Sequence, residues 1–151
     1  MAIPSRVARV IQYDVDGYPP EQMALVLTMS LLRTGAKPTT GLDALLVTSL
    51  DGGMDPNLSL NPERTLLADL AQGDLPRAVS VPAVRVLLER GADPLRADWT
   101  ASATPGVLGD VVDGWLAEPA THHRAVQLLA ACLAGPPPAA AWAADRLSQL
   151  P

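Results

Sequence analysis

The prolines and glycines of this chain fall between stretches of helical apolar periodicity, and this spacing constrains the fold more than any other feature. Fifteen prolines and eleven glycines occur among 151 residues. Because proline suits the first position of a helix and glycine commonly follows the last turn, such spacing marks where helices begin and end. Aromatic residues make up only 3% of the chain, so leucine, valine and alanine must build the core. We therefore expect an all-α fold.

Each expected helix has its own start and stop signals. In chain order the start and stop residues are Pro20 and Gly35; Thr40 and Gly52; Asn61 and Gly73; Pro82 and Gly91; Thr104 and Leu116; Thr121 and Gly135; and Ala139 and Leu150. Thr40 and Asp43 have the spacing of a capping box. Asn61 is the predicted N-cap before Pro62, and residues 74–80 are a predicted loop before Pro82.

The apolar residues inside these segments recur at offsets of three and four, which is typical of helices with one buried face. The segment Met23–Leu32 is apolar on nearly every face and is predicted to be buried on several sides. The other residues expected in the core are Leu42, Leu45, Leu46, Leu50, Leu66, Leu67, Leu70, Val84, Leu87, Leu88, Leu108, Val111, Val112, Trp115, Leu116, Ala125, Leu128, Leu129, Cys132, Leu133, Trp142, Leu147 and Leu150. Strand-like character is limited to Val7–Tyr13, and one strand cannot form a sheet.

Charge and cysteine content exclude several classes of protein. The net charge of −5 and the scattered arginines disfavour a nucleic-acid-binding domain, which needs a basic surface. Cys132 is the single cysteine, so a disulfide-stapled secreted scaffold is excluded and a cytoplasmic location is expected. No signal peptide follows the early arginines, and no apolar run reaches the roughly 20 residues that span a bilayer. The residue usage is that of a high-GC bacterial genome.

Comparison of the chain with itself reveals a repeat. The segment Leu87–Pro94 reads as a helix end followed by a turn, and Leu50–Asn57 aligns with it, placing Gly53 and Gly91 38 residues apart. Thr65 and Thr104 stand 39 residues apart, close to the same period. A fixed period of this length is the signature of repeat architectures. Both glycines are predicted to end a helix in the left-handed conformation.

These segments resemble the ankyrin-repeat family, most clearly over residues 42–98. Val84–Pro94 is similar to the end of an ankyrin repeat, where a Gly-Ala-Asp turn leads to the next hairpin. The Thr-Pro-Leu-His signature of the family is kept only in part, at Thr65 and at Thr104-Pro105, and the period exceeds the usual 33 residues or so. The resemblance implies one domain over 1–151: an all-α solenoid of about three helix-turn-helix pairs. Residues 1–18 would be an irregular or short-strand segment, and 139–150 a capping helix.

Candidate catalytic and metal-binding residues do not form known constellations. His122 and His123 are adjacent and therefore point about 100° apart on a helix, whereas zinc-binding helices need a spacing of three or four. No serine lies in a nucleophile elbow, and Cys132 falls on an apolar stripe. We expect no enzymatic activity, no metal and no cofactor.

The residues after the helix ends are the candidate partner-binding surface, because in ankyrin-like stacks the turns and inner helices contact partners. These residues are Asp55, Asn57, Asn61, Asp93, Arg96, Asp98 and Trp99. Trp99 is either an interface anchor or a plug over the local core, and the sequence leaves both readings open.

The expected function is non-catalytic protein binding through the concave face, with a basic partner because the chain is acidic. By analogy with small acidic bacterial proteins, the role expected is that of an inhibitor or immunity-type protein. One alternative is a scaffold or regulatory subunit of a larger assembly. A second alternative is a small helical enzyme with a site between helix pairs. The sequence identifies neither the partner nor the oligomeric state.

Overall fold

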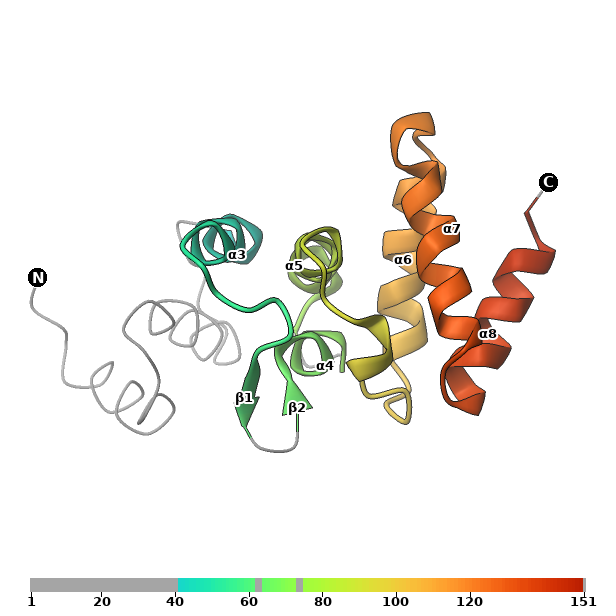
Figure 1. The fold of residues 1–151 in the computed structure, drawn as a ribbon, viewed down its shortest axis with the longest axis horizontal. Helices are drawn as coiled ribbons and strands as arrows, with labels where there is room; N and C mark the ends of the chain where they lie inside the picture. Colours follow the sequence, from blue (N-terminus) through green and yellow to red (C-terminus); the bar gives the residue numbers. More distant parts are fainter. Residues whose placement is uncertain (1–40, 62–63, 73–74, 151) are drawn as a thin grey trace, which may run out of the picture. The chain divides into compact units, whose positions relative to one another are not determined.

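The computed structural model describes residues 41–61, 64–72 and 75–150, and these residues are mainly helical (Figure 1). Two compact units are separated between Asp55 and Pro56. Several predictions lie outside the described residues: the strand-like segment Val7–Tyr13, the helix Met23–Leu32 and the Gly35 turn. In the described part of the chain, no helix has both the length and the apolarity that crossing a membrane requires.

The described part of the first unit is helix α3 (Leu42–Asp51) and the turn that follows it. Leu42 and Leu46 are buried, as the apolar spacing predicts, whereas Leu45 and Leu50 are half-buried. The N-cap position is occupied by Gly41, whose side chain cannot accept a hydrogen bond. The predicted capping box with Thr40 as N-cap is therefore wrong by one residue.

The second unit begins with a short antiparallel hairpin that the sequence did not predict. Strands β1 (Ser59–Asn61) and β2 (Arg64–Thr65) pair with an irregular register. Helix α4 (Leu66–Ala71) follows at once, and Thr65 is its N-cap because its hydroxyl accepts a hydrogen bond from the Ala68 amide at 3.2 Å. The prediction of Asn61 as N-cap is wrong, since the chain at Asn61 is still in extended pairing.

Helix α5 (Arg77–Glu89) begins earlier than the predicted start at Pro82. Its N-cap is Pro76, and Pro82 lies inside the helix. Residues 77–80, which were predicted to lie in a loop, therefore form the first turn of the helix. Pro76 and Pro82 both have the pattern of a helix start, and the prediction placed the start at the later of the two. The predicted core residues Val84 and Leu87 are fully buried, whereas Leu88 is half-buried.

Helices α6 (Thr104–Leu116) and α7 (His122–Leu133) follow, with the short 3₁₀ turns η1 (Pro94–Arg96) before α6 and η2 (Pro119–Thr121) between them. Thr104 is the first helical residue of α6, so its predicted N-cap role is wrong by one position. Thr121 occupies the predicted N-cap position of α7, but its hydroxyl makes no capping hydrogen bond and donates to the Trp115 carbonyl at 2.8 Å. Leu133 is 44% exposed and does not belong to the core.

The remaining apolar predictions for these two helices are confirmed for all but one residue. The buried members are Leu108, Val111, Val112, Trp115, Ala125, Leu128, Leu129 and Cys132. Leu116 is half-buried. The offsets of three and four thus identified one continuous face on each helix.

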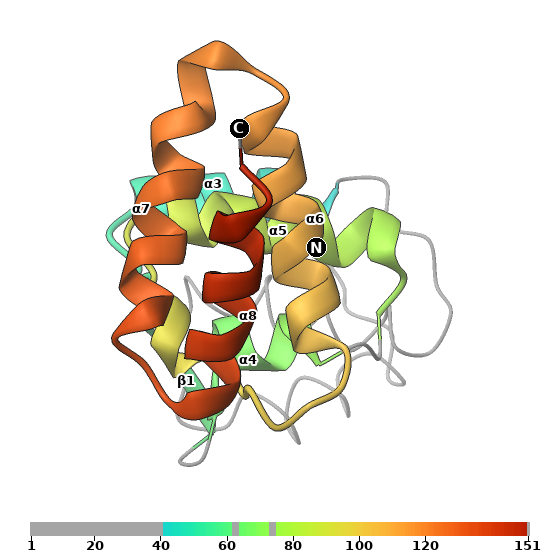
Figure 2. The ribbon, with the colours of Figure 1, turned by 90° about the vertical axis from the view of Figure 1, so that its right-hand side faces the viewer.

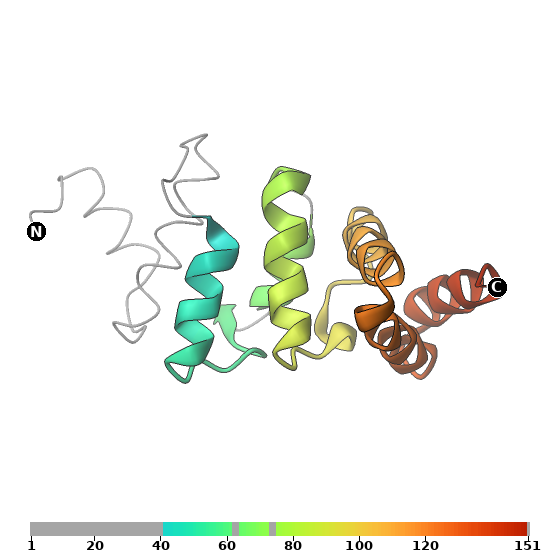
Figure 3. The same cartoon turned by 90° about the horizontal axis from the view of Figure 1, so that it is seen from above.

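Helix α8 (Pro137–Ser148) closes the second unit and begins within the three successive prolines. Ala139 and Ala143 are its buried residues, whereas Trp142, Leu147 and Leu150 are half-buried. Each helix of this unit packs against the next along the chain, from α4 to α8. Figures 2 and 3 show α6, α7 and α8 side by side, with α5 beside α6.

Candidate protein-binding surface at the turns

The turns after α3 and α5 have the same hydrogen-bond pattern. Gly53 has φ of 104° and Gly91 has φ of 100°, both in the left-handed region that costs glycine little. The amide of the next residue reaches back five positions in each case, from Met54 to the Ser49 carbonyl at 3.0 Å and from Ala92 to the Leu87 carbonyl at 2.9 Å. This is the Schellman pattern of helix termination. The predicted helix ends at both glycines are confirmed.

The segment after Gly91 is tied to the start of the second unit. The Asp93 amide donates to Asn57 Oδ1 at 2.7 Å, and Asp93 Oδ1 accepts from the Leu95 amide at 3.0 Å, which caps η1. Both side chains are half-buried. Their polar atoms therefore hold the turn together, and this structural role accounts for two of the predicted binding residues.

Two threonines fasten the segment between η1 and α6. Thr65 Oγ1 donates to the Arg96 carbonyl at 3.0 Å, and Thr104 Oγ1 donates to the Asp98 carbonyl at 2.7 Å. Thr65 is 8% exposed and Thr104 is fully buried. Because the carbonyls of residues 96 and 98 are fixed, the side chains of Arg96 and Asp98 project from a defined backbone.

A polar pocket of about 380 Å³ lies between these fixed segments, and its lining residues are Arg64, Ala68, Arg96, Ala97 and Asp98. Arg64 comes from β2, Ala68 from α4 and the other three from η1 and the residues that follow it. Arg64 donates to Gln72 Oε1 and lies 3.9 Å from Asp69. The guanidinium of Arg96 is exposed and has no ion pair within the described ranges.

Asp98 keeps its negative charge in this pocket. Its carboxylate accepts hydrogen bonds from the Thr100 hydroxyl and from the Thr100 amide at 3.0 Å. These two bonds, with a smaller contribution from the Arg64 charge, hold the pKa of Asp98 below its usual value of 3.8. At neutral pH the polar pocket therefore offers one carboxylate and two guanidinium groups.

Trp99 is buried beside this pocket. Its ring is 7% exposed, its Nε1 donates to the Pro94 carbonyl at 3.0 Å, and its centroid lies 5.3 Å from that of Trp142 at 48°. A ring with a satisfied donor and an aromatic neighbour is a plug over the local core rather than an exposed anchor. Of the two readings left open by the sequence, the structure shows the plug.

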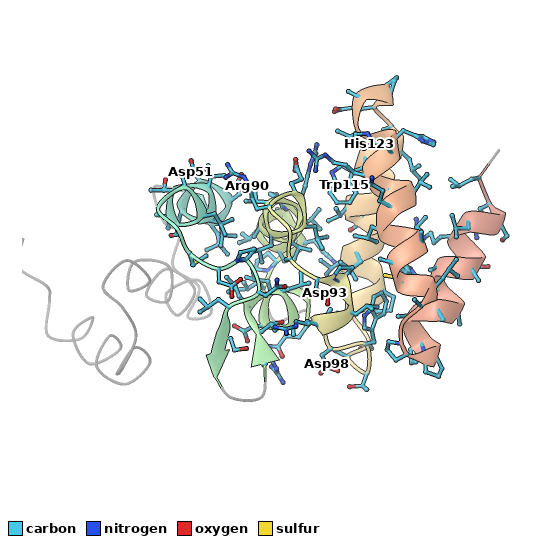
Figure 4. All side chains as sticks on the ribbon, in the orientation of Figure 1. Asp51, Arg90, Asp93, Asp98, Trp115 and His123 are labelled. Atoms are coloured by element: carbon cyan, nitrogen blue, oxygen red, sulfur yellow. The ribbon has the colours of Figure 1, made fainter. Side chains whose placement is uncertain are left out.

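The structure places the predicted residues of the second unit in two pairs: Asn57 and Asp93 share a hydrogen bond, and Arg96 and Asp98 line the polar pocket. Figure 4 labels Asp93 and Asp98. Asp55 is exposed in the first unit. Of Asn61, only the backbone at the end of β1 is described. Arg64 also lines the polar pocket and was not among the predicted residues. Its position one residue before the repeated threonine was the available signal, because that threonine marks the start of a helix at a hairpin.

The histidines and the cysteine do not gather at one site among the described residues. Groups of three histidine, cysteine or acidic side chains that could hold a metal do not occur there. His122 and His123 are exposed in the first turn of α7. Cys132 is fully buried, and burial raises the pKa of its thiol to about 12, with the Asp93 charge adding to the rise.

Comparison with known proteins gave no relative: no family model, no curated protein and no solved structure matches the chain.

Proposed function

We propose that the chain is a non-catalytic protein-binding module in which ankyrin-like helix pairs present their turns to a partner. The observation that carries the proposal is the polar pocket. It joins Arg64 to Arg96 and Asp98, more than 30 positions away, in one concavity. Fixed backbone beneath charged side chains is the arrangement that binding surfaces use, because little conformational entropy is lost when a partner docks.

Three local features support the ankyrin-like stacking. The ends of α3 and α5 share one hydrogen-bond pattern, a hairpin precedes α4, and the helices from α4 to α8 pack in chain order. A repeat whose helices each bury one face must cover that face with its neighbour. The turns between pairs then line up along one edge, which is the surface proposed to meet the partner.

The partner is proposed to be basic. The net charge of −5 favours encounter with a positively charged surface and raises the association rate at low ionic strength. Within the polar pocket, Asp98 would accept a cationic side chain of the partner, and Arg96 would pair with a neighbouring carboxylate. Mixed charge at the contact fixes the register of the two surfaces more than it adds affinity.

Capture experiments test the function. The immobilised chain is exposed to a lysate of the organism that encodes it, at about 50 mM and about 500 mM salt, which differ severalfold in screening length. Arg96→Ala is expected to weaken binding of the captured protein by about tenfold, a loss of about 1.4 kcal/mol. Arg77→Ala is the matched control, since Arg77 carries the same charge on the exposed start of α5.

Two results would contradict the proposal. One is the absence of any captured protein at either salt concentration. The other is a captured protein whose dissociation constant is the same for the Arg96→Ala, Asp98→Asn and unmodified chains.

A further inference from the structure

A second pocket lies apart from the polar pocket, at the junction of α5, α6 and α7. Its volume is about 190 Å³. Leu88, Pro94, Trp115 and Leu128 provide apolar lining, and Arg124 and Gln127 provide polar groups. In Figure 4, Trp115 lies on the opposite side of the second unit from Asp98. This apolar pocket uses none of the residues that line the polar pocket.

The indole of Trp115 carries a donor that is left unsatisfied. Trp115 is 2% exposed, and its Nε1 has no hydrogen-bond partner. An unpaired buried donor costs about 1–3 kcal/mol, so such groups need an explanation in a native structure. Nε1 is closed off from solvent, so an acceptor atom in the pocket that Trp115 lines would supply the missing partner once the indole shifts on binding.

Arg124 and Gln127, the polar side chains at this pocket, can both donate hydrogen bonds to a ligand. Arg124 and Gln127 are three residues apart on α7, so they lie on one face of the helix. Among the described residues, neither side chain has a hydrogen bond or an ion pair. A guanidinium, an amide and an indole N–H around apolar walls suit a ligand with an anionic, acceptor-rich head and an apolar body. A carboxylate is the group that a guanidinium binds in a bidentate manner.

The volume of the apolar pocket limits the size of the ligand that it can hold. Pockets for drug-sized ligands usually measure about 300–1,000 Å³. The apolar pocket is smaller, at about 190 Å³, and has room for one aliphatic residue with its carboxylate.

We infer that the apolar pocket binds the carboxyl-terminal residue of a partner polypeptide, where that residue is aliphatic. Its side chain lies against Leu88 and Leu128, and its terminal carboxylate pairs with Arg124. The indole of Trp115 shifts on binding so that Nε1 donates to the same carboxylate. The inference rests on the proposed protein-binding function for the existence of a polypeptide partner. It assigns that partner's chain end to a pocket that shares no lining residue with the polar pocket.

Indole N–H resonances in ¹⁵N-labelled full-length chain test the inference. The probes are N-acetyl-leucine, N-acetyl-leucinamide, 4-methylpentanoate and a pentapeptide ending in leucine. We expect the pentapeptide and N-acetyl-leucine to shift the Trp115 resonance, and the amide to bind at least about tenfold more weakly, because it lacks the charge. The pentapeptide is expected to bind more tightly than 4-methylpentanoate, which has the same acid head without a peptide group.

Variants locate the contact. Arg124→Gln is expected to weaken N-acetyl-leucine binding by about tenfold, the factor that about 1.4 kcal/mol represents. Ala131→Leu is expected to abolish it by filling the pocket, and Ala131 is exposed on α7, so the fold should tolerate the change. Arg85→Gln on α5 is the control that leaves binding unchanged, since Arg85 pairs with Glu89 and does not line the pocket.

Three results would overturn the inference. They are an unmoved Trp115 resonance at the solubility limit of every probe, equal affinity for the acid and the amide, and equal or tighter binding of 4-methylpentanoate than of the pentapeptide. The last would indicate a small-molecule site. None of these results depends on the capture experiment, so failure of the pocket and failure of the protein-binding function remain distinguishable.

Discussion

Gly91 and Gly114 occupy positions that differ in whether the backbone requires a glycine. Gly91 has φ of 100°, and an added Cβ would meet no atom within 4 Å, so any cost of substitution comes from the backbone conformation alone. Gly114 lies inside α6, where an added Cβ would meet only the Arg85 guanidinium, at 4.0 Å. One position requires glycine, and the other merely tolerates it.

Alanine substitution at these two positions should change stability in opposite directions. Gly91→Ala is expected to lower the free energy of unfolding by about 1–2 kcal/mol, the cost of a left-handed residue with a side chain. Gly114→Ala is expected to raise it by about 0.5–1 kcal/mol, because alanine is the better helix former. Urea unfolding of both variants measures the difference. Equal effects of the same sign would show that the Gly91 turn is not held in the left-handed region.

Cys132 is expected to be chemically inert in the folded chain. The thiolate is the reactive form, and burial raises the pKa of this thiol to about 12. Labelling with a thiol reagent at neutral pH should therefore be slow in buffer and fast in denaturant. Fast labelling of the folded chain would contradict the burial of α7 against its neighbours.

The same shift predicts a loss of stability in alkali. The folded pKa lies above the ordinary value of 9.0, so the unfolded chain releases its proton first as the pH rises. Stability from this group is fully present below pH 9 and falls between about pH 9 and 12, by at most about 1.4 kcal/mol per pH unit. Cys132→Ala should flatten that part of the profile, whereas the contribution of the other groups stays the same in both chains.

At the scale of the element, Pro82 shows a helix that forms in spite of a residue that opposes it. A proline in a helix interior removes one backbone hydrogen bond and crowds the preceding turn. Helix α5 nevertheless continues through Pro82, because Ala83, Val84 and Leu87 are fully buried on one face. Packing therefore outweighs local propensity here.

Replacing that proline should stabilise the helix. Pro82→Ala is expected to raise the free energy of unfolding by about 1–3 kcal/mol, up to the full cost of an internal proline. Chemical denaturation gives the value, and hydrogen exchange should show stronger protection in the first half of α5. Unchanged or lower stability would mean that the pyrrolidine ring contributes packing equal to what it costs.

Helix α6 carries glycines that leave space for arginines of its neighbours. An added Cβ at Gly106 would collide with the Arg77 guanidinium, and one at Gly109 with that of Arg146. Each arginine then reaches a carboxylate on α6, Arg77 to Asp110 and Arg146 to Asp113. The ion pairs join α5 and α8 to the two sides of α6.

The Arg146–Asp113 pair should contribute little to stability. Asp113 is 60% exposed, and exposed pairs are usually worth about 0–1 kcal/mol. A double-mutant cycle with Arg146→Gln and Asp113→Asn is expected to give a coupling below about 1 kcal/mol that shrinks further at high salt. A larger, salt-independent coupling would show that the pair is shielded from solvent.

At the scale of the whole molecule, the sequence predicted the helical class and most of the buried faces, because apolar periodicity depends on local spacing. The predicted helix starts were wrong where two nearby residues both had the pattern of a helix start. Both Pro76 and Pro82 could open α5, and both Asn61 and Thr65 could cap α4. The β1–β2 hairpin was missed because its strands are too short for a period to appear.

The candidate site was predictable only in part, for a related reason. The turn residues could be found because glycines mark the helix ends, as at Gly91. Which turn side chains remain available depends on contacts across long separations, such as the bond from the Asp93 amide to Asn57 Oδ1 and the stacking of Trp99 on Trp142. Such contacts arise only when the chain has folded, because they join residues that lie far apart along the chain.

The division of the chain into two compact units predicts that the second unit folds by itself. The second unit, residues 56–151, has its own buried residues in α4 to α7, including Leu66, Leu87 and Leu129. A fragment of about 100 residues with a core of this kind is large enough to fold alone. If the two units stack as proposed, the 56–151 fragment should unfold cooperatively but with lower stability than the full chain, because each unit of a stacked array gains stability from its neighbour.

Circular dichroism and urea unfolding of the fragment and the full chain measure this difference. The slope of the free energy with urea should scale with the surface exposed, so the fragment should show a smaller slope in proportion to its length. A fragment that lacks a cooperative transition would mean that residues 1–55 complete a core that both units share. In that case the chain would be one indivisible domain, and a stack of semi-independent pairs would be the wrong description of it.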